Sequence, residues 1–259
     1  MKLKHHLIWI IALMTSLQAV AQNAIDKDSV SVKSEVLVSE NLKFNYKQLI
    51  IPTVLISYGI IAFDNNELLG LNTQIKAEVA EHIDEKITID DFSQYVPATS
   101  VYLLNNLGVK GKNNLKDRSI IIGTSYLIVA VSVTGLKHAT KVERPDGSSF
   151  NSFPSGHTAT AFAGAEFLWQ EYKDTSCFYG IAGYLVASGT GLYRMLNNRH
   201  WLTDVAAGAG IGILSTKIAY WTFPYINKVF VKKQTKTSVG MLPFYNGKQI
   251  GLATVISLN

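Results

Sequence analysis

Cysteine and charged residues are both scarce in this sequence. The single cysteine among 259 residues, Cys177, excludes an intrachain disulfide. Charged residues make up only 17% of the chain and apolar residues 47%, whereas about 25% of residues are charged in ordinary soluble domains. The sequence also lacks a long basic run, which disfavours nucleic acid as a partner, while the net charge of +5 suits an anionic substrate or membrane surface. This composition indicates a compact membrane protein or a very apolar helical domain.

The first 21 residues are typical of a secretory signal peptide. Lys2 and Lys4 form a basic start, residues 7–17 an apolar stretch, and residues 19–21 a small-residue cleavage pattern. An uncleaved membrane anchor is the alternative interpretation. Both interpretations imply export from the cytoplasm.

Apolar segments separated by short polar stretches predict an all-α fold, a bundle of about six helices. A membrane span needs about 20 apolar residues, with a lower limit near 17. Residues 119–136 and 176–193 reach that limit, each with 18 uncharged residues, and we favour a membrane-embedded bundle over a soluble one. Residues 64–91 have the apolar spacing of an interfacial amphipathic helix. The other predicted helical or apolar segments are 49–63, 92–109, 154–169 and 205–225.

The chain divides into four predicted parts. These are a signal peptide (1–21), a polar arm (22–46), a helical domain (47–227) and a basic tail (228–259). Within the tail, residues 251–258 are apolar enough to form a strand.

The positions of the basic residues predict a membrane orientation. The positive-inside rule places residues 110–118 and 228–236 in the cytoplasm, so that 119–136 runs outward. Crossings at both 49–63 and 92–109 after a cleaved signal would contradict this placement. The number of spans therefore stays open.

The first of three polar clusters follows the 119–136 segment. Lys137 and Arg144 are seven residues apart, so both point the same way if the helix continues to Pro145, which would end it. Two cations at a helix exit are also typical of a membrane flank. We interpret the neighbouring His138 and Lys141 as ordinary surface residues.

The second cluster, Phe153 to His157, precedes an Ala- and Thr-rich segment. Free backbone N–H groups at a helix start, together with the Ser155 hydroxyl, can hold an anion. Gly156 allows a ligand to approach the backbone closely. Ordinary turn and cap chemistry also explains Pro-Ser-Gly, but it does not explain His157.

The third cluster contains Arg194, His200 and Asp204. His200 and Asp204 are four residues apart, so on a helix they share a face and the carboxylate can hold an imidazole N–H. Such a pairing fixes the tautomer and exposes the other nitrogen as a nucleophile. A purely structural His–Asp pair is the alternative, and packing is the favoured role for Trp201.

Read together, the clusters spell Lys-x6-Arg-Pro, Pro-Ser-Gly-His and Arg-x5-His-x3-Asp. This order resembles the three-part signature of the type 2 phosphatidic acid phosphatase family, which belongs with the bacterial acid phosphatases and vanadium haloperoxidases. The resemblance covers about residues 45–226, and Tyr193 stands where the family often has Ser. It implies a helical fold in which the three motifs meet at one end.

The resemblance also implies a mechanism. His200 would attack phosphorus to form a phosphohistidine, Asp204 would orient it, and His157 would protonate the leaving group and then activate water. The residues expected to hold the phosphate oxygens are Lys137, Arg144, Arg194, Ser155 and Gly156. Because cations would take the role of Mg²⁺ and no acidic cluster is evident near the motifs, we expect neither a metal nor another cofactor.

The predicted function is hydrolysis of a lipid phosphate or pyrophosphate. Candidate substrates are phosphatidic acid, phosphatidylglycerol phosphate, undecaprenyl pyrophosphate and a lipid A phosphate. The expected partners are this substrate and membrane lipids, without nucleic acid or a protein partner. The resemblance implies a location in the membrane of the bacterial cell envelope, with the active site facing the periplasm. The alternatives are a soluble periplasmic non-specific acid phosphatase, a haloperoxidase, and a non-catalytic phospholipid-binding or transport protein.

Overall fold

The computed structural model describes residues 45–62, 65–82, 88–231, 237–245 and 250–258. The predicted signal peptide, nearly all of the polar arm and part of the tail lie outside these residues. The elements are η2 (Tyr46–Leu49), α2 (Ile50–Ile61), α3 (Asn66–His82), α4 (Ile89–Ser93), α5 (Val96–Asn106), α6 (Leu115–Thr140), α7 (Gly156–Tyr172), α8 (Cys177–Leu196), α9 (Leu202–Val231), β1 (Thr237–Tyr245) and β2 (Ile250–Leu258).

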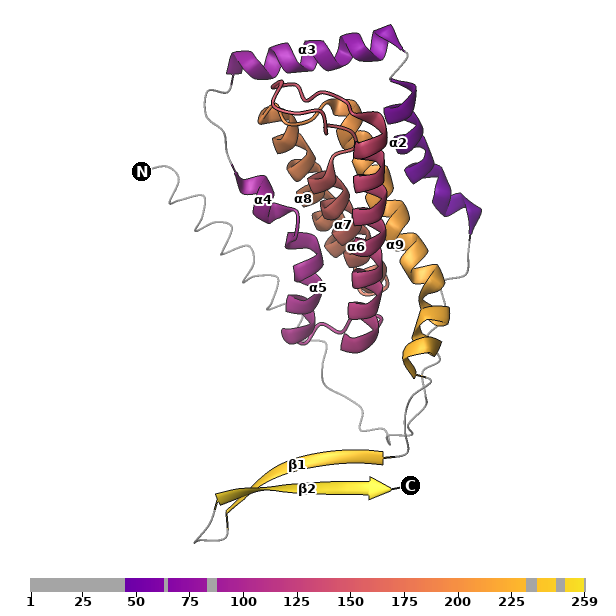
Figure 1. Ribbon diagram of the computed structural model, residues 1–259, viewed down its shortest axis with the longest axis vertical. Helices are drawn as coiled ribbons and strands as arrows, with labels where there is room; N and C mark the ends of the chain where they lie inside the picture. The colour runs from indigo at the N-terminus through magenta and orange to yellow at the C-terminus, as the bar shows by residue number, and fades with distance from the viewer. Residues whose placement is uncertain (1–44, 63–64, 83–87, 232–236, 246–249, 259) are drawn as a thin grey trace. The chain divides into compact units, whose positions relative to one another are not determined.

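The helices form a bundle in which α7 packs against α5, α6, α8 and α9 (Figure 1). The prediction of an all-α domain is confirmed, with eight α-helices among the described residues instead of about six. The described part of the tail forms an antiparallel hairpin, in which Thr237 pairs with Leu258 and Tyr245 with Ile250. Only the second of these two strands was expected from the sequence.

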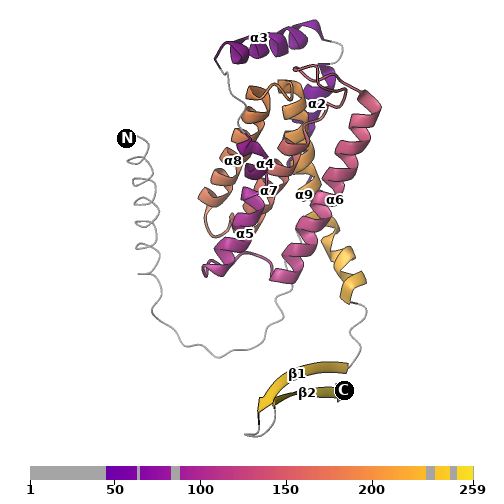
Figure 2. The same ribbon diagram turned by 60° about the vertical axis from the view of Figure 1, so that its left-hand side comes forward.

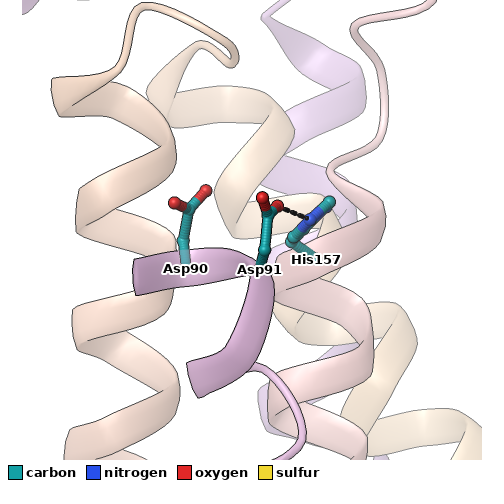
Figure 3. Close-up of side chains that lie close together, drawn as sticks. All are labelled: Asp90, Asp91 and His157. Carbon is teal, nitrogen blue, oxygen red and sulfur yellow. Dashed lines mark hydrogen bonds and ion pairs between the residues drawn. The ribbon is translucent and has the colours of Figure 1, made fainter. Parts of the chain in front are cut away.

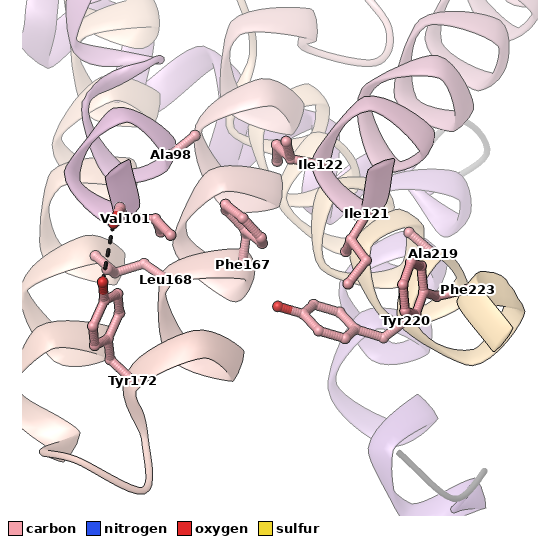
Figure 4. Packing of buried hydrophobic residues seen from close by; sticks show 10 residues of the cluster. All are labelled: Ala98, Val101, Ile121, Ile122, Phe167, Leu168, Tyr172, Ala219, Tyr220 and Phe223. Carbon is pink, nitrogen blue, oxygen red and sulfur yellow. Dashed lines mark hydrogen bonds between the residues drawn. The ribbon is translucent and has the colours of Figure 1, made fainter. Parts of the chain in front are cut away.

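A cluster of buried apolar side chains holds α5, α6, α7 and α9 together (Figure 4). Phe167 of α7 is fully buried in it, between Tyr102 of α5 and Tyr220 of α9. The hydroxyl of Tyr172 donates to the carbonyl of Val101 at 3.0 Å, which satisfies a polar group inside the core. This core fixes α7, whose first residues belong to the second polar cluster.

Two glycines allow α9 to cross α7 at short range. A Cβ on Gly212 would lie 2.3 Å from the carbonyl oxygen of Ala159, and one on Gly208 would lie 2.5 Å from that of Ser155. Small residues four apart are typical of closely packed membrane helices. Because Asp204 is four residues before Gly208, it lies on the same face of α9 and is directed at the start of α7.

Among the described residues, two helices are long and apolar enough to cross a membrane, Leu115–Thr140 and Leu202–Lys228. The first agrees with the sequence prediction. The second span lies in α9, whereas the sequence analysis expected it at residues 176–193, which form most of α8. The Gly, Ser, Thr and Tyr residues of α8 lower its mean hydropathy, although it carries no charge before Arg194. In the same part of the chain, a third span is counted if the helical residues Tyr46–Ile61 and Asn66–Glu78 form one segment across a bend of 91°. The 11-residue α5 is about 16 Å long, too short for the crossing considered at 92–109.

Lys217 lies inside the second of these long helices, and a buried partner explains how it is tolerated. Its Nζ is 2.7 Å from Oε1 of Glu166 on α7, which is only 2% exposed. The hydroxyl of Tyr184 on α8 also donates to this carboxylate. Ionisable residues within membrane helices usually face the bundle interior and pair with one another in this way.

Candidate active site

The three polar clusters meet at one end of the bundle because the helices alternate in direction (Figure 2). α6 and α8 end where α7 and α9 begin. The cluster residues therefore occupy helix ends and the loops between them, which are 141–155 and 197–201. α3 lies across this same end of the bundle in both views (Figures 1 and 2).

His200 and Asp204 form a buried pair, with Nδ1 of His200 3.5 Å from Oδ2 of Asp204. The helical spacing considered in the sequence analysis does not apply, because His200 lies between α8, which ends at Leu196, and α9, which begins at Leu202. Asp204 is the third residue of α9, and its Oδ2 accepts the backbone N–H of Trp201 at 2.9 Å. A side chain in the first turn that accepts the N–H of the residue just before the helix, here Trp201, is the capping-box arrangement of a helix start.

Ser152 is a site residue that the sequence analysis missed. Its hydroxyl is fully buried and donates to Oδ2 of Asp204, and it lies 3.5 Å from Nδ1 of His200. The serine therefore donates to the same carboxylate oxygen that accepts the backbone N–H of Trp201. It stands just before the Phe-Pro-Ser-Gly-His sequence, where nothing in the local pattern indicated that it would reach a residue 52 positions later.

Burial lowers the pKa of His200 to about 4. Asp204 opposes this effect, while Lys137 and Arg194 lower the pKa further. The imidazole is consequently neutral at physiological pH. If Nδ1 carries the proton and faces Asp204, then Nε2 has a free lone pair, as a nucleophile requires.

This lowered pKa predicts a loss of stability in acid. The unfolded chain binds a proton at His200 near pH 6.5, whereas the folded chain does so only near pH 4. The free energy of unfolding should thus be highest above pH 6.5 and should fall as the pH drops towards 4. Thermal unfolding across pH 4–8 measures this slope, which should be smaller in His200→Gln than in the wild type. Equal slopes in the two proteins would contradict the assignment.

Lys137, Arg144 and Arg194 approach the His200–Asp204 pair from three different segments. Arg144 lies on the loop after α6, since that helix ends at Thr140 with Lys141 in the left-handed conformation (φ 49°). The condition under which Lys137 and Arg144 would point the same way from one helix, its continuation to Pro145, is therefore not met. Burial, and then the nearby Arg194 and Arg199, lower the pKa of Arg144, while the carboxylates of Asp146 and Asp204 partly oppose this effect.

Some donors of these cations are satisfied and others are not. Lys137 Nζ donates to the backbone carbonyls of Asn151 and Ser152. In contrast, Nε of Arg144 and Nε of Arg194 are buried and have no hydrogen-bond partner among the described residues. Buried donors without a partner cost free energy, so an anion that accepts from them would be stabilised.

The second cluster lies at the start of α7. Ser155 is the N-cap residue, but its buried hydroxyl pairs with the hydroxyl of Thr158 at 2.8 Å and makes no capping hydrogen bond. The backbone N–H groups that follow, including that of Gly156, lie in the first turn, where a helix offers them no carbonyl. An anion here would thus be held by the backbone of α7, with His157 beside it.

Two further residues missed by the sequence analysis are Asp90 and Asp91 of α4 (Figure 3). Arg194 forms an ion pair with the buried Asp90, and Nε2 of His157 lies 2.8 Å from Oδ1 of Asp91. The carboxylates and His157 offer ligand atoms within 4.8 Å of one another, a group that could hold a metal ion. The premise that no acidic cluster lies near the motifs was therefore wrong. Separations of 66 and 104 residues left no local signal for these contacts.

α3 is attached to the site by two contacts. Nδ2 of Asn72 donates to Oγ1 of Thr203 at 3.0 Å, and Nζ of Lys76 lies 5.6 Å from the centre of the Trp201 ring. Trp201 Nε1 donates to the carbonyl of Glu143, which agrees with a packing role. A cavity of about 290 Å³, lined mainly by apolar atoms, lies between α3, Trp201 and Asp204.

Parts of the chain are similar in sequence to known proteins. The sequence model described as the PAP2 superfamily matches residues 118–228. The lipid A 1-phosphatase of Porphyromonas gingivalis is 38% identical over 162 residues, 60% of this chain and 36% of that protein. The bacitracin transport permease protein BcrC of Bacillus licheniformis is 34% identical over 77 residues, 30% of this chain and 36% of that protein. The matched regions thus span about a third of each of these relatives.

Two crystal structures of bacterial proteins are also similar. LpxE of Aquifex aeolicus is 24% identical, with a TM-score of 0.44, covering 57% of this chain and 94% of that one. The transmembrane PAP2-type phosphatidylglycerolphosphate phosphatase of Bacillus subtilis is 22% identical, with a TM-score of 0.46, covering 71% and 98%. The region that matches the PAP2 superfamily model, residues 118–228, contains all three polar clusters, from Lys137 to Asp204.

Proposed function

We propose that this protein is a metal-independent phosphatase that removes phosphate from a lipid phosphate or pyrophosphate through a phosphohistidine at His200. The observation that carries the proposal is the convergence of three cations on a buried His–Asp pair. Two of these cations have buried donors without partners. A phosphate would accept hydrogen bonds from both donors.

The proposed reaction has two steps. In the first, Nε2 of His200 attacks phosphorus in line, the bond from phosphorus to the leaving oxygen breaks, and His157 gives that oxygen a proton. In the second, His157 takes a proton from water as the water attacks the phosphohistidine, which releases inorganic phosphate and restores His200. Lys137, Arg144 and Arg194 stabilise the charge on the phosphoryl oxygens, where preorganised donors lower the barrier most.

An apolar groove next to His157 supports a lipid substrate. It measures about 270 Å³, and Tyr126, Val129, Ala130 and Val133 of α6 line one side of it. The outer face of α6 also exposes apolar side chains, with Leu127 65% and Val131 66% exposed. A hydrocarbon chain can therefore enter from a bilayer that surrounds α6 while its phosphate reaches the cations.

The proposed location is the membrane of the bacterial cell envelope, with the site facing the periplasm. Lys110, Lys112 and Lys116 are exposed at the end of α6 remote from the site. Arg118, which the sequence analysis counted with them, is buried and donates to the carbonyl of Asn113. α6 is about 39 Å long, enough to separate these lysines from Lys137 by a bilayer.

Phosphate release in mild detergent with EDTA tests the proposal. The substrates are the four candidates named in the sequence analysis: phosphatidic acid, phosphatidylglycerol phosphate, undecaprenyl pyrophosphate and lipid A. Lipid A is of particular interest because one relative is a lipid A 1-phosphatase. We expect turnover that survives EDTA and is faster on one of these lipids than on glycerol phosphate. Equal rates on soluble and lipid substrates would favour a non-specific acid phosphatase. No turnover by folded protein would favour a binding protein.

The groove is tested by Ala130→Trp, which fills it. We expect kcat/KM for a long-chain phosphatidic acid to fall about tenfold. The tryptophan would keep about two methylenes of the acyl chain out of the groove, and each lost methylene weakens binding by about 0.8 kcal/mol. The value for a short-chain, water-soluble phosphatidic acid should change less than about twofold. Val131→Trp is the matched control, because its side chain points away from the groove and should leave both values unchanged. A loss on both substrates with Ala130→Trp would show that the groove does not hold the chain.

A further inference from the structure

The short helix α4 brings two adjacent carboxylates to the site from outside the three motifs. It is fixed to α8 by the ion pair of Asp90 with Arg194. A second contact joins the hydroxyls of Ser93 and Thr190 at 2.7 Å. These two attachments leave the next carboxylate, that of Asp91, in a defined place beside α7 (Figure 3).

Asp91 contacts the predicted acid–base residue. Its Oδ1 lies 2.8 Å from Nε2 of His157, and the two side chains are 54% and 29% exposed. The Asp91 carboxylate also lies 4.0 Å from Arg194 Nη1, so it is not the main partner of that guanidinium. Since Asp91 occupies Nε2, only Nδ1 of His157 is left to exchange a proton with another group.

The charges around His157 come from α4 and α8. Burial and then Arg194 lower the pKa of His157, whereas Asp91 and Asp90 raise it. A general acid must hold its proton until the leaving group needs it. The carboxylate at Nε2 therefore offsets part of the effect of the desolvation and of the guanidinium, although the pKa of His157 stays below its usual value.

We propose that Asp91 is a positioning residue for catalysis, which holds His157 through Nε2 so that Nδ1 carries the transferred proton. This inference depends on the proposed function. As the P–O bond to the alcohol breaks, its electron pair stays on oxygen, and the proton of Nδ1 joins that oxygen. The neutral ring, still bound to Asp91, then accepts a proton from the attacking water at the same nitrogen.

A divalent cation between Asp90, Asp91 and His157 is the competing interpretation. The carboxylate of Asp90 already neutralises Arg194, and that of Asp91 already faces the imidazole. A metal ion would have to replace these contacts and would lie close to the Arg194 guanidinium. The charges in place thus favour the positioning role.

The test compares two leaving groups, because a positioned acid matters only when the departing oxygen needs a proton. The substrates are p-nitrophenyl phosphate, whose phenolate leaves without help, and dodecyl phosphate, whose alkoxide does not. Asp91→Asn should lower kcat/KM about tenfold or more for dodecyl phosphate and less than about threefold for p-nitrophenyl phosphate. kcat/KM reports the steps up to departure of the alcohol and is independent of the later hydrolysis of the phosphohistidine.

Three further variants complete the design. Asp91→Glu, which keeps the carboxylate, should recover part of the loss, and Asp174→Asn, an exposed carboxylate after α7, should behave as the wild type. Asp91→Asn should have no added effect on dodecyl phosphate when His157 is already alanine.

Equal losses on both substrates, additive losses in the double variant, or wild-type activity in Asp91→Asn would each overturn the inference while the phosphatase remains. A wild type that is inactive, or active only without EDTA, would overturn the proposed function and the inference with it.

Discussion

His200→Ala is expected to abolish phosphate release, with a loss in kcat of about 10⁴-fold or more. In enzymes that act through a covalent nucleophile, removing that nucleophile lowers kcat about as much as removing all the catalytic residues together. The remaining cations can still bind phosphate, so substrate affinity should change far less than kcat. Phosphate release from the best lipid substrate of the panel, at saturating concentration, measures the loss.

The control for this variant is His138→Ala. His138 is exposed at the end of α6 and was interpreted as a surface residue, so its removal should leave turnover unchanged. Trapping of radiolabelled phosphate on the wild type, but not on His200→Ala, would support the phosphohistidine. Activity that persists in His200→Ala would mean that the nucleophile is a different residue.

Arg194→Met is expected to lower both stability and activity, because it leaves the carboxylate of Asp90 buried without its cation. Asp90 is 1% exposed, and Arg194 is its ion-pair partner. Breaking a buried pair from one side costs about 3–5 kcal/mol, which corresponds to a fall in the melting temperature of about 6–20 °C for a domain of this size. Thermal unfolding in detergent measures the change.

The double variant Asp90→Asn with Arg194→Met separates the two effects. Neutralising Asp90 removes the unpaired charge, so most of the lost stability should return. Activity should not return, since the guanidinium proposed to hold the phosphate is still missing. If the double variant is as unstable as Arg194→Met, the ion pair is not the source of the effect. Recovery of activity would remove Arg194 from the phosphate site.

The sequence alone determined the features that depend on local patterns. Apolar segments of helical length predicted an all-α domain, and the segment 119–136 predicted the long helix α6. The short spacing from His200 to Asp204 kept these residues together although they do not share a helix. Asp204 is held by the first turn of α9 itself, a contact between residues three apart. Such short-range geometry is fixed by chain connectivity, and a sequence pattern can express it.

The tertiary structure alone decided which distant residues join the site. Ser152 reaches Asp204, and Asp90 and Asp91 reach Arg194 and His157, across 52 to 104 residues. These contacts depend on how closely the helices cross, and Gly208 and Gly212 set the approach of α9 to α7. They also depend on where α6 stops, since its end at Thr140 places Arg144 on a loop. Packing of side chains between helices determines both the approach of α9 to α7 and the end of α6. The hydrophobic periodicity of the sequence does not predict this packing.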